Sequence, residues 1–173
     1  MTVAQRERAA LVATLRDTSP DAPTLCEGWD ARDLAAHLVV RERRLDTGPG
    51  ILIPAFAGYT ERVQNHVAAS TDWDVLLDQV AEGPPIYSPF KILDPVANPA
   101  EMFIHHEDVR RGGAEVGPRE FSGVVDKQLL KLAKRFGSLN LRKSEVPVVL
   151  TPPKLPPVTV GGKAGVAERG DDV

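Results

Sequence analysis

Cysteine is nearly absent from this 173-residue chain, in which Cys26 is the only one. One cysteine cannot form a disulfide within the chain, and it cannot build a metal site made of thiolates alone. Any metal ion would be held mainly by His, Asp and Glu, so the positions of the four histidines decide the interpretation. Since the sequence shows no disulfide framework, we expect a reducing, cytoplasmic compartment.

Long apolar runs and an excess of positive charge are also missing. No uncharged apolar run approaches the roughly 18 residues of a membrane span, and residues 1–17 carry charges where a signal peptide needs its apolar segment. Lys and Arg number 21 against 24 for Asp and Glu, a net charge of −3. This balance does not favour a phosphate backbone as partner. We therefore expect a soluble protein with neither a nucleic-acid nor a membrane partner.

Apolar residues at helical spacing predict a mainly α protein. Helix 54–69 should bury the stripe formed by Phe56, Tyr59, Val63 and Val67. The Gly-Pro-Gly sequence at 48–50 should break the chain, and the proline-rich residues 86–97 should be irregular. The predicted helices cover residues 2–17, 31–45, 54–69, 72–82, 99–111 and 122–141.

Two helix starts carry specific signals. Asp30 can cap the helix that begins at Ala31, and Trp29 before it can pack on Leu34 one turn into the helix. Asn98 followed by Pro99 has the pattern of an N-cap with proline at the first helical position, where the missing N–H costs nothing. These signals mark where the two helices that carry the candidate site begin.

The C-terminal part differs from the rest of the chain in its sequence pattern. The segments 146–150 and 158–160 predict a β-hairpin, and the glycine-rich, charged end from residue 161 is expected to be poorly ordered. We predict a four-helix bundle over 1–141 and a short, partly disordered β-rich extension over 142–173.

One constellation of side chains could carry chemistry. Glu101 and His105 lie four residues apart, so they share one face of the helix 99–111. His37 lies on the inward face of the helix 31–45. Three N and O ligands from two facing helices are typical of a divalent-metal site with open coordination positions. The alternative is that the three side chains simply hydrogen-bond in a bundle core.

Longer strings in the same regions resemble a known family. The sequences TLCEGWDARDLAAHLVVRERR (24–44), GILIPAFAGYTERVQ (50–64) and EMFIHHEDVRR (101–111) look like the DinB-like metal-binding superfamily. Within it, they are most similar to the actinobacterial branch that includes the N-terminal domain of mycothiol-dependent maleylpyruvate isomerase. The resemblance covers roughly residues 1 to 140. It implies an up-and-down four-helix bundle whose metal is held by His37, Glu101 and His105.

The resemblance also implies cofactors and a chemistry. The metal would be zinc, with nickel or another divalent ion as the alternative, and mycothiol or another small thiol would be the cosubstrate. A thiol or water activated on such a metal becomes a nucleophile for transfer or isomerisation. The isomerase has a C-terminal α/β domain, whereas residues 142–173 are too few to match it, so maleylpyruvate itself is not the predicted substrate. A metal-binding or interaction module without catalysis is the alternative function, and no residue is assigned as catalytic.

Five further residues near these motifs deserve separate hypotheses. Asp108 and Asp33 could each orient a ligating imidazole. Arg41 and Arg110 could hold an anionic small thiol or electrophile, although surface ion pairs explain them equally well. Cys26 is either a reactive thiol near a helix start or, as we favour, a small buried residue. A homodimer through helix faces is an alternative to a monomer, but no long heptad pattern supports it.

Overall fold

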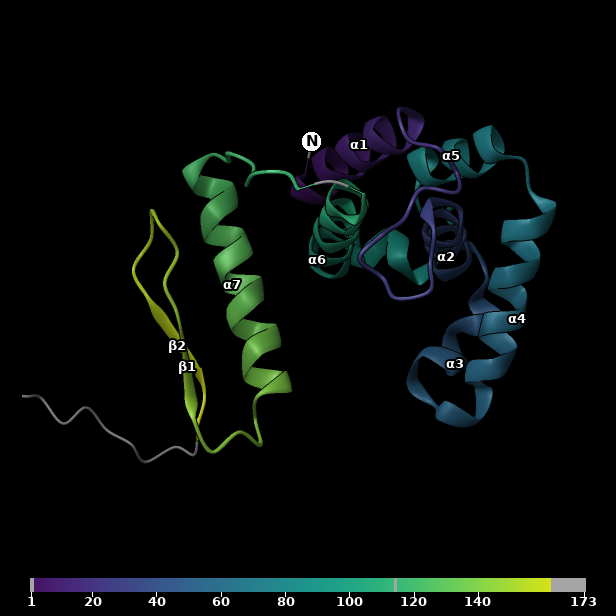
Figure 1. Ribbon diagram of the computed structural model, residues 1–173. Helices are drawn as coiled ribbons and strands as arrows, with labels where there is room; N and C mark the ends of the chain where they lie inside the picture. The colour runs from purple at the N-terminus through teal and green to yellow at the C-terminus, as the bar shows by residue number, and fades with distance from the viewer. Residues whose placement is uncertain (1, 114, 163–173) are drawn as a thin grey trace, which may run out of the picture. The chain divides into compact units, whose positions relative to one another are not determined.

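The protein is mainly helical, with a small two-stranded antiparallel sheet near its C-terminal end (Figure 1). The computed structural model describes residues 2–113 and 115–162, and only the backbone of residues 51–52 and 92–97. The disorder predicted for the end of the chain falls, from residue 163 on, outside the described residues. The elements are α1 (Val3–Arg16), α2 (Ala31–Arg43), η1 (Leu45–Thr47), α3 (Gly48–Leu52), α4 (Pro54–Ser70), α5 (Trp73–Glu82), α6 (Pro89–Gly112), α7 (Gly123–Asn140), β1 (Pro147–Leu150) and β2 (Val158–Gly161).

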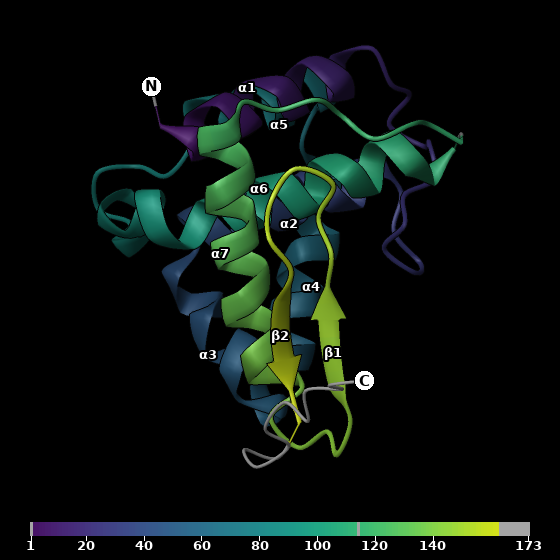
Figure 2. The same cartoon turned by 90° about the vertical axis from the view of Figure 1, so that its left-hand side faces the viewer.

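The chain divides into two compact units after Gly117. The first unit holds the helices from α1 to α6, and the second holds α7 with β1 and β2 (Figure 2). The sequence predicted a boundary after residue 141, with α7 in the bundle. Within the second unit α7 packs on β2, where a side chain at Gly137 would press on Val160. Glycine at this position lets helix and strand approach closely.

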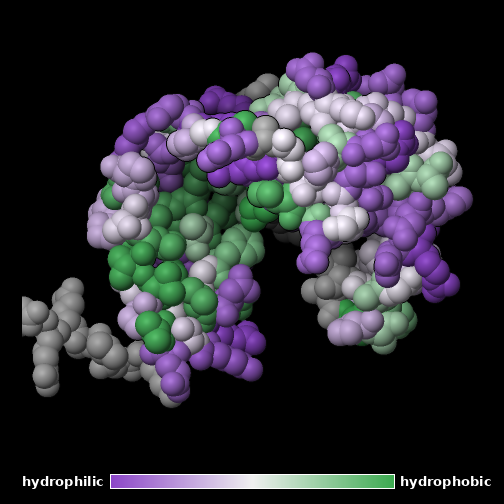
Figure 3. All heavy atoms as spheres, in the orientation of Figure 1, coloured by the Kyte–Doolittle hydropathy of each residue, from purple (hydrophilic) through white to green (hydrophobic). Residues whose placement is uncertain are grey.

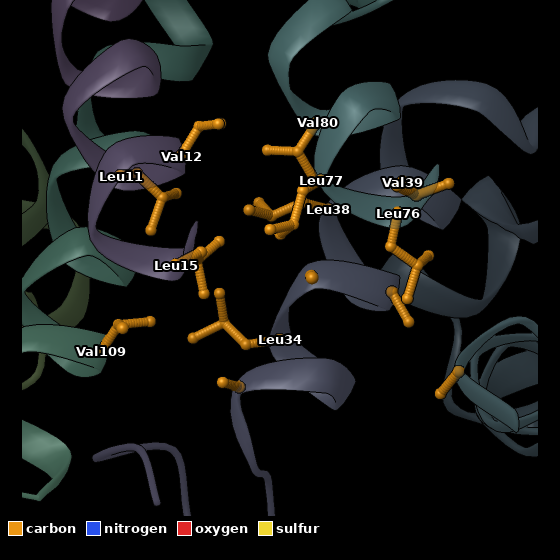
Figure 4. Packing of buried hydrophobic residues seen from close by; sticks show 14 of the residues in the cluster. Leu11, Val12, Leu15, Leu34, Leu38, Val39, Leu76, Leu77, Val80 and Val109 are labelled. Carbon is orange, nitrogen blue, oxygen red and sulfur yellow. The ribbon is translucent and has the colours of Figure 1, made fainter. Parts of the chain in front are cut away.

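The core of the helical unit lies between α1, α2, α5 and α6. Leucines of α1 and α2 meet at its centre, and α5 closes it from the far side (Figure 4). The α1 helix packs mainly on α6, and α2 packs mainly on α4. The largest fully buried apolar side chains are Leu11, Leu15, Leu34, Leu38, Leu76, Leu77 and Met102. Among the described residues, no helix is long and apolar enough to cross a membrane.

The start of α2 follows the sequence prediction. Asp30 accepts a hydrogen bond from the backbone N–H of Asp33, whose carboxylate accepts one from the N–H of Asp30. This reciprocal pair satisfies two of the N–H groups that a helix start leaves free. Trp29 packs against the core cluster beside it.

The prediction of irregular structure over 86–97 holds for residues 86–88 and is wrong from Pro89 on. Helix α6 already begins at Pro89, because Ser88 caps it by accepting a hydrogen bond from the N–H of Phe90 (3.3 Å). Asn98 is therefore no N-cap: it is fully buried inside the helix and uses its side chain to link α6 to α2. The Gly-Pro-Gly sequence likewise does not break the chain, since Pro49 fits at the start of the short α3.

The buried face of α4 is rotated from the predicted stripe. Gln64 and Ala68 are buried, whereas Phe56 and Tyr59 are 51% and 40% exposed. An apolar stripe predicts the buried face of a helix only when the residues that this face packs against are also apolar. Here the neighbour is a histidine of α2 that binds the Gln64 side chain (3.3 Å).

Several apolar side chains of the C-terminal unit are exposed. Figure 3 shows hydrophobic residues gathered on this unit, in the region of α7 and the two strands. Val124 is 74% exposed, Leu139 56% and Val149 56%. The hairpin pairs in the predicted segments, with Val148 opposite Val160 and Leu150 opposite Val158.

The end of α6 packs closely against the loop that precedes α2. A Cβ atom at Gly112 would collide with the backbone of Pro23 and Thr24. Gly112→Ala is therefore expected to lower the free energy of unfolding by about 1–3 kcal/mol, as overpacking does, which denaturant titration measures. Gly58→Ala is the control, because it lies within α4 with open space around it. That change should instead add about 0.5–1 kcal/mol.

Candidate metal centre

Three potential metal ligands converge between α2 and α6. Nε2 of His37 and Nε2 of His105 each lie 3.3 Å from the same oxygen, Oε1 of Glu101. The two imidazole rings are 5.3 Å apart between centroids. His37 comes from α2, while Glu101 and His105 stand one turn apart on α6. The triad predicted from the sequence is therefore brought together in the structure.

The spacing of the donor atoms suits a metal ion. Ligand atoms bound to zinc at about 2.0–2.1 Å in a tetrahedron are separated by about 3.3–3.4 Å, close to the two separations of 3.3 Å seen here. All three donor atoms lie within 4.8 Å of one another, and the side chains are 13–25% exposed. The residues thus fit a divalent ion that keeps open positions toward solvent.

Each histidine is oriented through its other ring nitrogen. Nδ1 of His105 donates to Oδ2 of Asp108 (3.1 Å), and Nδ1 of His37 donates to Oε1 of Gln64 (3.3 Å). Because both acceptors are oxygens without a proton, each ring donates from Nδ1, and Nε2 is the atom left to bind a metal ion. This is how metal-ligating histidines are usually oriented. Asp108 thus takes the orienting position predicted for it.

The charges around Glu101 favour its ionised form. Burial opposes ionisation, but hydrogen bonds with His105 and His37 and the charge of Arg41 outweigh it and hold the pKa of Glu101 well below its usual value. For His105, burial favours the neutral ring, but the hydrogen bond and charge of Glu101 and the charge of Asp108 outweigh it and raise its pKa. The carboxylate is thus available as a ligand across the whole physiological range.

Arg41 and Arg110 differ in their relation to the triad. Nε of Arg41 lies 3.3 Å from Oε1 of Glu101, and its guanidinium stacks over the ring of Phe90 at 4.1 Å. Arg110 pairs with Glu107 (2.7 Å) and reaches the carbonyl of Gly117. Arg41 therefore adds positive charge beside the candidate centre, whereas Arg110 is engaged with its own helix and the segment after it.

Asp33 is placed at the helix start and not beside the imidazole of His37. Its carboxylate accepts the N–H of Asp30, as described above. Asp33 lies four residues before His37 and so on the same side of the helix. Its carboxylate nevertheless binds a free N–H group at the start of the helix, which is closer. Gln64, on α4, holds His37 instead.

Two contacts at the centre were outside the sequence-based prediction. Gln64 has no signal in the sequence beyond being a polar residue next to an apolar stripe. The Cys26 thiol is half-buried and donates to Oδ2 of Asp108 (3.2 Å), 3.9 Å from Nδ1 of His105. Burial, together with the hydrogen bond and charge of Asp108, raises the pKa of Cys26 to about 11. It is thus neither a reactive thiolate nor a plain apolar residue.

Replacing Gln64 by leucine should weaken metal binding by about 10–100-fold, the usual effect of removing the group that orients a ligating histidine. The His37 ring would lose its only acceptor from α4 among the described residues and could rotate away from Glu101. Competition with a chromophoric chelator measures the affinity. Asn65→Leu, at the exposed neighbouring position, is the control and should leave the affinity unchanged.

The fold and the site together define a helical protein with a candidate metal centre of two histidines and one glutamate. Comparison with family models then identifies its family. Residues 2–89 match the model of the mycothiol maleylpyruvate isomerase N-terminal domain, about half of the chain, and the protein belongs to that family. The match includes His37 and ends before Glu101 and His105. No curated protein and no solved structure gives a match.

Proposed function

We propose that this protein binds one divalent metal ion through His37, Glu101 and His105 and uses it to activate a small thiol or water for transfer or isomerisation. One observation carries this proposal: both Nε2 atoms face the same oxygen of Glu101, while each Nδ1 is held by an acceptor. A cluster held only by hydrogen bonds would need a proton on all four ring nitrogens. Two imidazolium ions and the Arg41 guanidinium would then stand around the two carboxylates of Glu101 and Asp108.

The arrangement of the helices supports a DinB-like four-helix bundle, which we propose is formed by α1, α2, α4 and α6. The α1 helix packs on α6, and α2 packs on α4. The ligands then come from two helices of the bundle core, a common location for metal sites in such folds. In this proposal α5 caps the bundle, and α7 belongs to the C-terminal unit.

The residues of the centre have distinct roles. A divalent cation held there would lower the pKa of a thiol or water bound beside it and so supply a nucleophile near neutral pH. Glu101 contributes one negative charge and the two neutral imidazoles contribute none. Arg41, whose Nε lies 3.3 Å from Glu101, adds a positive charge that favours an anionic partner such as a thiolate. Trp29 packs on the His37 ring at 4.9 Å and limits its rotation.

We propose zinc as the metal, because two histidines and one carboxylate are typical of catalytic zinc sites with an open position. The family is associated with mycothiol, so we propose mycothiol or a similar small thiol as cosubstrate. Cys26 supports this choice: the chain's own thiol is held protonated by Asp108. Because small thiols of this kind are kept reduced inside cells, we propose the cytoplasm as the compartment.

The test compares thiol consumption with and without metal. The zinc-loaded protein, the metal-free protein and the His37→Ala variant would be mixed with mycothiol and 1-chloro-2,4-dinitrobenzene, an electrophile that forms a coloured thioether. We expect the loaded protein to accelerate thioether formation at least about tenfold, as a modest nucleophile activation would. The other two samples should stay at the uncatalysed rate. Full metal uptake without any acceleration would contradict thiol activation and support the non-catalytic module.

A further inference from the structure

Cys26 belongs to a second group of ligand-type side chains on the opposite side of His105. Sγ of Cys26 lies 3.2 Å from Oδ2 of Asp108 and 3.9 Å from Nδ1 of His105, and Nδ1 lies 3.1 Å from Oδ2. All three donor atoms are within 4.8 Å of one another. The triad of His37, Glu101 and His105 uses Nε2 of the same ring, so His105 joins the two groups.

From this geometry we propose that Cys26, Asp108 and Nδ1 of His105 form a second metal site, selective for a divalent cation that prefers sulfur, such as Cd²⁺ or Zn²⁺. Bonds of about 2.0–2.3 Å from zinc to O, N and S ligands place the donor atoms about 3.3–3.8 Å apart in a tetrahedron. The three observed separations differ from this range by a few tenths of an ångström. Side-chain rotation within the ordinary range closes that difference.

The backbone holds Cys26 at this position. The N–H of Leu25 donates to the carbonyl of Asp108 (3.1 Å), so the loop is tied to α6 at the residue that supplies the carboxylate. The N–H of Cys26 donates to Oγ1 of Thr24 (3.1 Å), which donates to the carbonyl of Trp29 (2.8 Å). The lack of a side chain at Gly112 lets the loop approach α6 closely. The donor atoms are therefore arranged before any cation arrives.

The ligand types explain the selectivity. A thiolate and a carboxylate give the site two negative charges, and soft thiolate ligands favour Zn²⁺ and Cd²⁺ over Mg²⁺ or Ca²⁺. Filling it displaces two protons, one from Sγ of Cys26 and one from Nδ1 of His105, with no change of oxidation state. The imidazole of His105 then bridges the two cations through its two nitrogens. This second site shares His105 with the one assigned above, but it uses the other ring nitrogen and neither His37 nor Glu101.

The experiment titrates the metal-free full-length protein with Cd²⁺ while recording the ultraviolet absorption of thiolate-to-cadmium charge transfer and the release of protons. We expect about two equivalents per chain, as two three-ligand sites require, with the charge-transfer band belonging to one of them. Cys26→Ser should bind one equivalent and show no band. His37→Ala should lose the other equivalent and keep the band.

These variants separate the two sites. The absence of the band, or a Cys26→Ser variant that still binds two equivalents, would each overturn the second site. A titration that ends at one equivalent with the band present would instead contradict the triad. Loss of uptake in His37→Ala affects only the triad of the proposed function. Circular dichroism checks the fold of Cys26→Ser, and Cys26→Ala replaces it in the titration if the serine variant is unfolded.

Discussion

Replacing His105 by alanine is expected to lower the affinity for Zn²⁺ by well over a hundredfold. The change removes the ligand itself, so the loss should exceed the about 10–100-fold caused by removing an orienting group. After this change, the contacts of Glu101 described above are those with His37 and Arg41. Competition with a chromophoric chelator gives the affinity, and elemental analysis of the purified variant gives the metal content.

A histidine on the surface provides the matched control for this prediction. His66 lies exposed on α4, so His66→Ala removes an imidazole without touching the centre and should bind zinc as the native chain does. If His105→Ala still retained one equivalent of zinc at the native affinity, the assignment of His105 as a ligand would be wrong. Both variants should keep the helical circular dichroism spectrum.

Replacing Glu42 by leucine should cost about 3–5 kcal/mol of the free energy of unfolding. Glu42 is 1% exposed and accepts two hydrogen bonds from the guanidinium of Arg8, itself 6% exposed. Asn98 also donates to this carboxylate (3.3 Å). Removing one partner of a buried ion pair takes away charge-assisted hydrogen bonds in a place with little water to replace them, and such changes cost about this much. Urea denaturation followed by circular dichroism measures the loss.

Two comparisons separate this effect from a general effect of losing charge. Arg16 and Asp78 form an ion pair with side chains 56% and 67% exposed, so Asp78→Ala should cost no more than about 1 kcal/mol. The double variant Arg8→Met with Glu42→Leu should recover most of the stability, because it replaces both charges of the pair with apolar side chains. A cost for Glu42→Leu no larger than that of Asp78→Ala would contradict the role given to this pair.

The candidate metal centre could be predicted because its residues obey local rules. Helical spacing places Glu101 and His105 on one face, and the capping pattern of Asp30 with Asp33 fixes where α2 begins and hence where His37 lies. Both rules depend on residues within one or two turns. The mainly helical class and the two pairing strands follow from the same kind of local pattern.

The parts that were missed depend on contacts between distant segments. Asn98 has the pattern of a helix cap, yet it lies inside α6. There its side chain hydrogen-bonds to Arg41 and Glu42 of α2. Gln64 turns inward because His37 needs an acceptor there. Cys26 meets Asp108 only because the loop before α2 folds back onto the end of α6. A sequence read locally contains no information on these pairings.

The packing of α7 on the hairpin also depends on a contact between segments that are distant in the sequence. The apolar residues Val125 and Leu129 of α7 satisfy the spacing of a bundle helix, and Gly137 leaves room for Val160 of β2 to approach closely. The choice between these partners depends on the hairpin that follows, which lies beyond the range of helical periodicity.

The most direct test of the proposed centre is a crystal structure of the zinc-loaded protein with anomalous diffraction recorded on both sides of the zinc absorption edge. We expect a zinc peak within about 2.0–2.2 Å of Nε2 of His37, an oxygen of Glu101 and Nε2 of His105, the bond lengths expected for zinc with these ligands. A structure in which these three side chains bind only one another, with zinc absent or held elsewhere, would contradict the proposed centre.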